Sequence, residues 1–422
     1  MSDAGAPPEP IEPLVIEPAN DPYGVLKNRD FLLYMIGRFV ASFAQQMMAV
    51  AVGWEIYERT KSKLDLGLVG LVQVVPMFLF TFPAGHVADN YDRKKVIVWM
   101  QLLVGVACAG LAAVTATQAP VMFMYASLFL FGAARTYLWA ASASFMPQLV
   151  ARNQFAKAVT WNSGAFQVSA VAGPAAGGAL IALTGTAEWV YVFNVVAAVV
   201  CALLIWMVHT HHKVTAKEPM SFKSVGAGLK FVYRTKIVLG SLTLDLFAVL
   251  LGGATALLPV YAKDILHVGP RGLGWLQGAL PLGSLLMSLI LVHRPPLQKA
   301  GQTLLWAVAG FGLATIVFGY STTFWLSFLM LFLCGVTDYV SVVVRHTLVQ
   351  LLTPDAMRGR VSAVNSLFIG TSNQMGEFES GFVASLTSSQ FAVVSGGVGT
   401  IVVVILVTVL WPEIRKYGRL DS

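Results

Sequence analysis

Eight ionisable side chains interrupt long apolar stretches of this chain. Carboxylic acids can bind and release protons, and arginines can hold carboxylates by charge-assisted hydrogen bonds. In the centre of a bilayer, each such residue costs about 2.5–3.5 kcal/mol on insertion scales. Left unpaired, the set would therefore cost more than the typical folding free energy of about 5–15 kcal/mol. We expect these groups to face water or one another; they are Arg38, Glu55, Arg135, Asp245, Asp338, Arg345, Glu377 and Glu379.

The positions of these residues suggest partners for some of them. Arg38 and Asp245 lie at similar depths in two apolar stretches, and an ion pair between them is plausible. Asp338 and Arg345 are seven residues apart, which is two helical turns on one face, so they can line one surface. Glu55 and Arg345 lie near the ends of their stretches and can reach the membrane interface. A hydrogen-bond network without a role in transport remains an alternative for each residue.

The most polar segment within any of the apolar stretches is "SNQMGEFESG", which contains Glu377 and Glu379. Two carboxylates so close in sequence could share a proton. We therefore expect a proton site among Asp245, Asp338, Glu377 and Glu379, with arginines as counter-charges. Amides in the same stretches could contact a substrate in a polar cavity; they are Gln45, Gln46, Asn162, Gln167, Asn365, Asn373 and Gln374.

The composition identifies the elements that carry these residues. The 422 residues are 56% hydrophobic and 12% charged, with a mean hydropathy of +0.71, whereas soluble domains have about 25% charged residues. Apolar runs of about 20 residues span a bilayer as helices, and the alternating segments of a β-barrel are not seen. We expect an all-α integral membrane protein with twelve transmembrane helices at 31–56, 66–88, 94–116, 120–144, 157–183, 189–208, 237–262, 271–292, 302–319, 323–346, 361–386 and 390–411.

A long polar connection divides the twelve stretches into six plus six. We expect a disordered tail at 1–26, which is rich in Pro and Glu, a first six-helix bundle at 27–208, a linker at 209–236, and a second bundle with a short tail at 237–422. With both termini on one side, that side carries 20 of the Lys and Arg residues outside the spans and the other side carries 5. The positive-inside rule then places both termini in the cytoplasm.

Several other classes of function are not supported. The net charge of +7 follows from the basic loops, so no nucleic-acid partner is expected. Cys108, Cys201 and Cys334 lie in separate apolar runs, and "HTHH" at 209–212 is typical of a solvated loop, so we expect no disulfide and no metal. The nucleotide-binding pattern G-x-x-x-x-G-K-S/T is absent, and no His, Asp and Glu cluster has metal-ligand spacing. We expect no cofactor and no enzymatic activity.

The two halves resemble each other. "GLVGLVQVVP" from Gly67 and "GLGWLQGALP" from Gly272 are similar at an offset of about 204 residues. "WNSGAFQVSAVAGPAAGG" and "VNSLFIGTSNQMGEFESG" share Asn, Ser and two Gly at an offset of 203 residues. The halves therefore form a parallel repeat, and a cleft between them could open to either side of the membrane in turn.

The loop "GHVADNYDRKKV" after the second stretch resembles the signature Gly-x-x-x-Asp-Arg/Lys-x-Gly-Arg/Lys-Arg/Lys of the major facilitator superfamily. Gly85, Asp89, Arg93 and Lys94 fit, whereas Asn90 and Asp92 depart from the pattern. Asp92 is instead a plausible N-cap for the next helix. "NRDFLLYMIGRFVASFAQQM", "LGLVGLVQVVPMFL", "MPQLVARNQFAKAVTWNS" and "RGRVSAVNSLFIG" are similar to the branch that contains the bacterial enterobactin exporter.

The resemblance implies a cytoplasmic latch formed by Gly85, Asp89, Asp92, Arg93 and Lys94. In it, Asp89 would hold the cytoplasmic ends of the halves together in the outward-open state by facing the N-terminus of the eleventh helix, near Arg358 and Arg360. A positive-inside anchor is the alternative. The resemblance also implies a functional role for Arg135.

Together these features predict a secondary active transporter of the bacterial inner membrane that works by alternating access. We expect proton-coupled efflux of a small organic molecule, such as a siderophore or an amphipathic compound, by a monomer. Its partners would be that substrate, protons and the lipid bilayer. Solute import or lysophospholipid flipping on the same fold is the alternative. A transporter-like sensor or scaffold is disfavoured, because every cytoplasmic loop is short.

Overall fold

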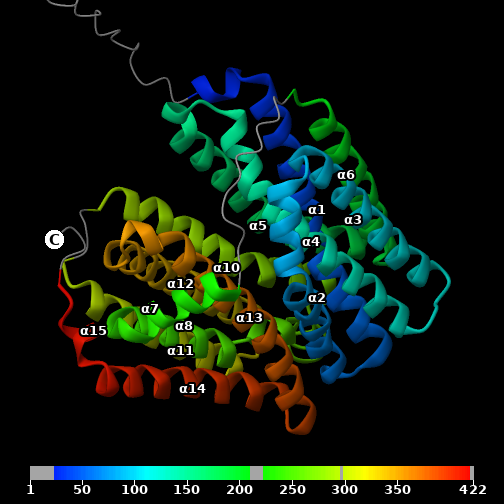
Figure 1. Ribbon diagram of the computed structural model, residues 1–422. Helices are drawn as coiled ribbons and strands as arrows, with labels where there is room; N and C mark the ends of the chain where they lie inside the picture. Colours follow the sequence, from blue (N-terminus) through cyan, green and yellow to red (C-terminus); the bar gives the residue numbers. More distant parts are fainter. Residues whose placement is uncertain (1–22, 210–221, 295–297, 419–422) are drawn as a thin grey trace, which may run out of the picture.

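The first half of the molecule is a bundle of six long helices. The structure is a computed structural model that describes residues 23–209, 222–294 and 298–418, and no strand occurs in these ranges. The six helices occupy the upper right of Figure 1. They are α1 (Arg29–Thr60), α2 (Lys63–Asn90), α3 (Arg93–Ala116), α4 (Val121–Leu149), α5 (Phe155–Thr184) and α6 (Glu188–Trp206).

The second half repeats this arrangement with one interrupted helix. Its first span, Lys236–Ile265, joins α8 (Lys236–Leu251) to the 3-10 turn Ala254–Leu257, the short α9 (Leu258–Val260) and the π-helical turn Tyr261–Ile265. The break follows Gly252 and Gly253, both of which lie against neighbouring helices. The remaining helices are α10 (Gly269–Val292), α11 (Ala300–Tyr320), α12 (Phe324–Leu352), α13 (Asp355–Leu386) and α14 (Ser389–Leu410), followed by the short α15 (Pro412–Lys416).

The twelve-helix architecture predicted from the sequence is confirmed. In the described ranges, eleven spans are long and apolar enough to cross a membrane, and α13 is the twelfth. Its 32 residues are long enough, but its Asn, Gln and Glu side chains lower its hydropathy. The helix that looks least like a membrane span is therefore the one that carries more of the expected polar residues than any other helix.

Local sequence explains where several helices begin and end. The side chain of Asn28 accepts hydrogen bonds from the backbone N–H groups of Asp30 and Phe31, and Ser62 caps α2 in the same way. Asp92, the residue that departs from the signature loop, accepts from the backbone N–H of Lys94 and caps α3. Gly185 ends α5 with a left-handed backbone (φ 77°) that favours glycine.

Two pairs of helices join the halves: α2 packs on α13, and α5 packs on α10. Glycines bring these backbones close together. A Cβ at Gly178 of α5 would lie 2.2 Å from the carbonyl oxygen of Pro270 and 3.1 Å from Cα of Gly274. A Cβ at Gly67 of α2 would lie 3.1 Å from Cα of Gly381 on α13. The segments that repeat in the sequence are thus the ones that form the seam between the halves.

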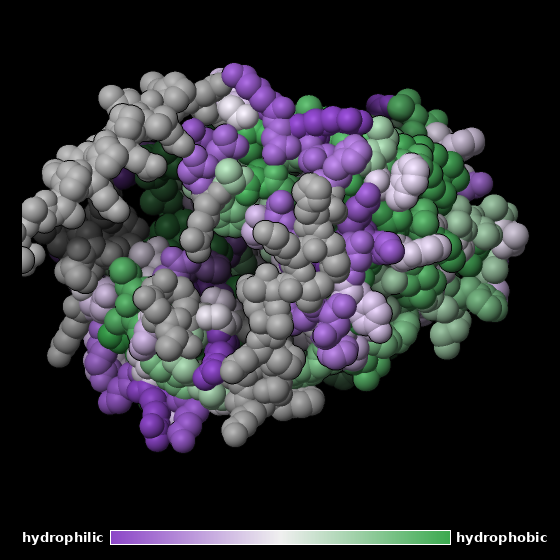
Figure 2. Space-filling model, turned by 45° about the horizontal axis from the view of Figure 1, so that its top comes forward, coloured by the Kyte–Doolittle hydropathy of each residue, from purple (hydrophilic) through white to green (hydrophobic). Residues whose placement is uncertain are grey.

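The halves meet at one end of the molecule, which we call the closed end. There, Lys263 forms an ion pair with Glu58, and the hydroxyl of Tyr57 donates to Asp264. Lys63 Nζ also donates to the carbonyl oxygen of Ala384 at 3.3 Å. Toward the other end, which we call the open end, the two groups of helices diverge (Figure 1). A hollow opens between them there, with hydrophilic side chains around it (Figure 2).

Two segments at the expected domain limits form short helices. The disordered tail was expected to extend to residue 26, but Gly24–Lys27 form a 3-10 helix in which Val25 is fully buried against Phe31 and Ala158. Residues 1–22 of that tail lie outside the described residues. The expected linker at 209–236 contains a helix, α7 (Phe222–Arg234), which packs on α8 and α13; residues 210–221 lie outside the described residues.

Candidate functional site: a charge cluster between the halves and an ion-pair pocket

Three charged residues from both halves form the central charge cluster: Arg38 of α1, Arg135 of α4 and Glu377 of α13. Arg135 interacts electrostatically with both Glu377 and Arg38. Its side chain is exposed although it lies halfway along α4. Glu377 belongs to the other half, so this interaction links the two halves. A guanidinium and a carboxylate held on opposite sides of a wet gap can attract each other or exchange partners.

Glycine makes room for Glu377. A Cβ at Gly70 of α2 would lie 3.0 Å from Oε2 of Glu377 and 2.6 Å from the backbone oxygen of Gln374. The carboxyl group therefore rests against the backbone of the opposite half. One turn earlier on α13, the side-chain Oε1 of Gln374 is buried without a hydrogen-bond partner in the described part of the chain. A buried polar atom without a hydrogen-bond partner is usually explained by a bound ligand, a water molecule or a functional role.

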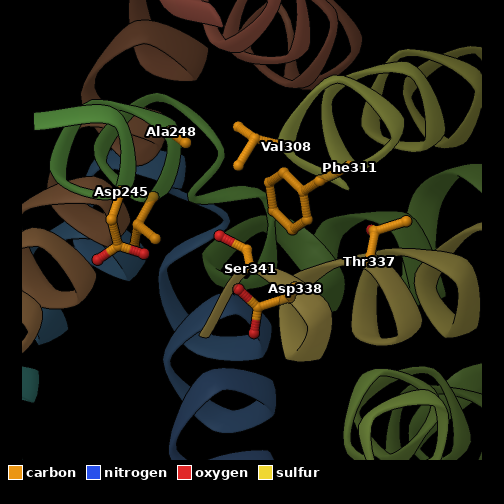
Figure 3. Close-up of a pocket in the computed structure, with 8 residues that line it drawn as sticks. Asp245, Ala248, Val308, Phe311, Thr337, Asp338 and Ser341 are labelled. Atoms are coloured by element: carbon orange, nitrogen blue, oxygen red, sulfur yellow. The ribbon is translucent and has the colours of Figure 1, made fainter. Parts of the chain in front are cut away.

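A second polar site, the ion-pair pocket, lies inside the second half. Asp245 of α8 forms an ion pair with Arg345 of α12, and both side chains are almost completely buried. Asp245 also lines a cavity of about 10 Å³ together with Asp338 and Ser341 of α12 and Phe311 of α11 (Figure 3). This volume is close to the minimum that holds one water molecule. Two carboxyl groups thus share a small cavity beside a single guanidinium.

The expected amides of the first half lie on α1 and α5. Gln46 packs on α5. A Cβ added at Gly173 of α5 would lie 2.6 Å from the Cβ of Gln46. Gln45, Asn162 and Gln167 are half-buried. These residues lie on the two helices that the seam with α10 brings next to the second half, but no hydrogen bond joins them to the central charge cluster in the described residues.

The expected amides of the second half all lie on α13. Asn365 is 4% exposed, and its Oδ1 has no hydrogen-bond partner in the described part of the chain. Asn373 is exposed, and its Nδ2 donates to the carbonyl oxygen of Ile369 on the same helix at 2.9 Å. Together with Gln374 and Glu377, Asn365 supplies polar groups along one helix, so α13 is the most polar wall of the site.

Two expected partnerships are wrong. Asp245 is paired with Arg345 in its own half, not with Arg38 across the gap. Glu377 and Glu379 do not form a shared site, because residues two apart on a helix point to different faces. The carboxyl of Glu377 rests against Gly70, whereas that of Glu379 accepts a hydrogen bond from Ser380 Oγ at 3.4 Å.

Glu55 and Arg345 also do not extend to the interface as expected. Arg345 is 2% exposed and Glu55 is 6% exposed. Glu55 accepts a hydrogen bond from Thr115 Oγ1 at 2.9 Å and pairs with Arg59 at 3.3 Å. Burial of a charge is tolerated when it has such partners, so Glu55 has a structural role within the first half.

The signature loop makes its contacts within the first half. Arg93 donates from Nε to the carbonyl oxygen of Ala88 at 3.0 Å and from Nη1 to that of Ser144 at 3.3 Å. Lys94 Nζ donates to the carbonyl oxygen of Val208 at 2.8 Å. A Cβ at Gly85 would meet nothing within 4 Å. Asp89 has no ion pair or hydrogen bond with another described residue.

Of the two arginines expected near Asp89, only Arg360 has a described side chain, and it forms no ion pair with another described residue. The side chain of Arg358 lies outside the described residues, and Arg360 is exposed. The loop lies at the open end, where the halves are apart. A latch that engages only when this end closes would be released in this conformation, so the latch stays a prediction.

Sequence reasoning missed the residues at the closed end. Trp54, Tyr57 and Glu58 of α1 meet Lys263 and Asp264, which follow the break in the first span of the second half. Opposite charges at the outer ends of repeat-equivalent spans were a possible signal. The sequence places Glu58 and Lys263 in loops between expected spans, where a lysine is counted toward the orientation of the protein in the membrane. Pairing between the two halves was therefore not evident.

The chain matches known transporters over almost its whole length. Residues 20–418 match the family model MFS_3, described as transmembrane secretion effector. The Enterobactin exporter EntS of Citrobacter koseri is 25% identical over 92% of this chain and 93% of its own length. The protein of the same name from Escherichia coli O1:K1 is 24% identical over the same shares.

Solved structures show the same fold at low identity. The nucleoside transporter NupG matches with a TM-score of 0.72 and 13% identity, covering 92% of this chain and 99% of that protein. A bacterial homologue of the lysosomal transporter Spinster, in an inward-facing and occupied conformation, matches with a TM-score of 0.71 and 13% identity, covering 94% and 98%. The chain belongs to the transmembrane secretion effector family (MFS_3) of the major facilitator superfamily and is a multi-pass membrane transporter.

Proposed function

We propose that this transporter exports a small organic molecule by alternating access, in exchange for protons. The observation that carries the proposal is the central charge cluster, in which Arg135 of one half lies within electrostatic range of Glu377 of the other, whose carboxyl rests against Gly70. Relatives named Enterobactin exporter support export and suggest a siderophore or a similarly amphipathic compound as substrate.

The basic loops support an inward-open orientation. The first described residue, Tyr23, and the last, Gly418, both lie at the open end. In the sequence count, 20 Lys and Arg residues belong to the side of the termini and 5 to the other side. By the positive-inside rule, the open end faces the cytoplasm. The hollow would then collect substrate from the cytoplasm or the inner leaflet.

Exchange requires proton and substrate to bind in turn. A deprotonated Glu377 can accept hydrogen bonds from hydroxyl or amine groups of the substrate, while Arg135 and Arg38 balance its charge. When Glu377 binds a proton from the outside, its carboxyl loses acceptor capacity and the substrate is released. Arg135 is then free of its counter-charge, and the protonated carrier can return to the open state.

Substitution of Glu377 tests this proposal. Substrates are first sought by a thermal-shift screen of siderophores, drugs and lipids, with enterobactin as one probe. In everted vesicles, we expect Glu377→Gln to lower pH-gradient-driven uptake at least tenfold. Substrate affinity of the unaltered protein should fall as pH is lowered, because the charged carboxylate is the stronger acceptor for the substrate's donors. This pH dependence should disappear in Glu377→Gln.

Glu379→Gln is the matched control, because it makes the same change two residues away on another face of α13. It should keep most of the gradient-driven transport. Gradient-driven uptake that survives in Glu377→Gln would rule out Glu377 as the coupling group, and survival after neutralising Asp245, Asp338, Glu377 and Glu379 together would rule out proton coupling at these acids. Flux into right-side-out vesicles alone would favour import instead.

A further inference from the structure

The strongest unassigned site is an apolar cavity under the amphipathic helix α7. It has a volume of about 460 Å³, which is within the range of about 300–1,000 Å³ for small-molecule sites. Its walls are the apolar side chains of Leu229 and Val232 on α7, Leu239 and Leu242 on α8, and Phe368 on α13. Leu229 is 49% exposed, so the described residues do not close the cavity.

The rim of this cavity is basic. Lys230 and Tyr233 of α7 line it, and Arg234 lies four residues after Lys230, on the same side of the helix. The side chains of Lys230 and Arg234 are exposed, and neither forms an ion pair with another described residue. Tyr233 is 75% exposed. A molecule that fills the cavity would thus find apolar walls inside and positive charge at the mouth.

The position of the cavity indicates what fills it. Leu239 and Leu242 belong to the first two turns of α8, at the open end of the bundle. Helix α7 lies beside these turns, and its apolar side packs on α8 and α13. This is the level at which spans meet the lipid headgroups, and an amphipathic helix with basic residues is typical of that interface.

We propose that this cavity binds an anionic phospholipid of the cytoplasmic leaflet. One acyl chain would lie between α7, α8 and α13, and the phosphate would lie against Lys230 and Arg234, with the hydroxyl of Tyr233 as a further donor. An anionic lipid matches both the apolar interior and the basic rim. The proposal is independent of the transported substrate.

The test uses the purified full-length protein, stripped of lipid in a non-ionic detergent. Phosphatidylglycerol and phosphatidylcholine with identical acyl chains are titrated, and binding is followed by the shift in unfolding temperature. A phosphatidylglycerol with a diazirine on one acyl chain is then cross-linked, and the labelled peptides are identified by mass spectrometry. We expect tighter binding of phosphatidylglycerol and cross-links in α7, α8 and α13.

Variants separate the two parts of the site. Lys230→Gln with Arg234→Gln should weaken phosphatidylglycerol binding about thirtyfold, because each basic residue near an anionic lipid contributes about 1 kcal/mol and 1.4 kcal/mol is a factor of ten. Leu242→Trp, which fills the cavity, should remove the cross-links to α13. Lys95→Gln, at an exposed lysine of α3, is the matched control and should bind like the unaltered protein.

Two results would overturn the proposal. One is equal affinity for the two lipids in the unaltered protein. The other is a set of cross-links that lies outside α7, α8 and α13. An equal change of the cross-links in Lys95→Gln and in the double variant would contradict the proposal in the same way. Since the two glutamine substitutions are on the surface, they should leave the fold intact even if Leu242→Trp does not.

Discussion

At the scale of single residues, the ion-pair pocket shows how a charged pair can be accommodated inside a membrane helix bundle. Asp245 and Arg345 are both withdrawn from solvent and form an ion pair with each other. Withdrawing two charges from water is unfavourable, and their mutual attraction offsets this only while both are present. Asp338 lines the same small cavity as Asp245.

Replacing one member of the Asp245–Arg345 ion pair should destabilise the protein more than replacing both members. Arg345→Met leaves Asp245 buried without a partner, and we expect it to lower the free energy of unfolding by about 3–5 kcal/mol. The double variant Arg345→Met with Asp245→Leu replaces the pair by apolar side chains and should recover most of this loss. Denaturant unfolding of the four proteins in a double-mutant cycle measures the difference.

If the double variant is as unstable as Arg345→Met, the pair does not behave as a unit. Transport assays on the same proteins add a second readout. A stable double variant that no longer couples transport to a pH gradient would assign the pair to the proton pathway as well as to the fold.

At the scale of helices, close backbone contacts at glycine define the seam between the halves. Gly67 and Gly381 join α2 to α13, and Gly178 and Gly274 join α5 to α10. Small residues allow helices to approach closely in a bilayer and to move against each other with little side-chain obstruction. The internal repeat places these contacts symmetrically, so both sides of the seam can separate together when the closed end opens.

A methyl group at this seam should disturb it. In Gly178→Ala the new Cβ would lie 2.2 Å from the backbone oxygen of Pro270, so α5 and α10 must move apart. We expect a lower unfolding temperature and weaker closure of this end. Gly164→Ala on the same helix is the control, because its Cβ would meet nothing within 4 Å, and replacing glycine in a helix should raise stability by up to about 1 kcal/mol.

The comparison is made by thermal unfolding of the purified proteins in the same detergent. Equal unfolding temperatures for the two alanine variants would show that the seam tolerates a wider separation than the backbone contacts indicate.

At the scale of the whole molecule, the closed end holds the two halves together by polar contacts. Lys263 pairs with Glu58 and lies 5.7 Å from the ring centroid of Trp54, while Tyr57 donates to Asp264. All of these contacts join α1 to the end of the first span of the second half. Because they exist only when this end is closed, they stabilise the observed conformation over one that opens the opposite way.

Removing a closed-end contact should therefore favour the outward-open conformation. We expect Lys263→Gln to increase labelling of Ala175→Cys, at the seam next to Gly274, by a membrane-impermeant maleimide added to intact cells. Background labelling should be low, because Cys108, Cys201 and Cys334 are buried. Arg271→Gln, which removes an exposed charge at the same end, is the control and should leave labelling unchanged.

Unchanged labelling in Lys263→Gln would mean that the glycine seam, and not the ion pair, maintains closure. An equal rise in both variants would instead indicate a general effect of charge at this surface.

Much of the architecture follows from the sequence alone. Hydrocarbon thickness sets the length of each apolar run, so the twelve helices and their order could be read directly, including α13 with its two glutamates. The internal repeat identified the segments that form the seam. The acids and arginines of the site could be selected because a charge within an apolar run is costly in a bilayer unless it faces water or a partner.

Only the tertiary structure decided which of these charges meet. Charge and depth along a helix do not specify the direction in which a side chain points, so Asp245 pairs with Arg345 and not with the equally deep Arg38. Nor could local sequence reveal which end is closed, since the contacts of Glu58 with Lys263 and of Gly178 with Gly274 join residues far apart in the chain. The physical reason is that helix rotation and the tilt of the two halves depend on packing between them, which no single segment encodes.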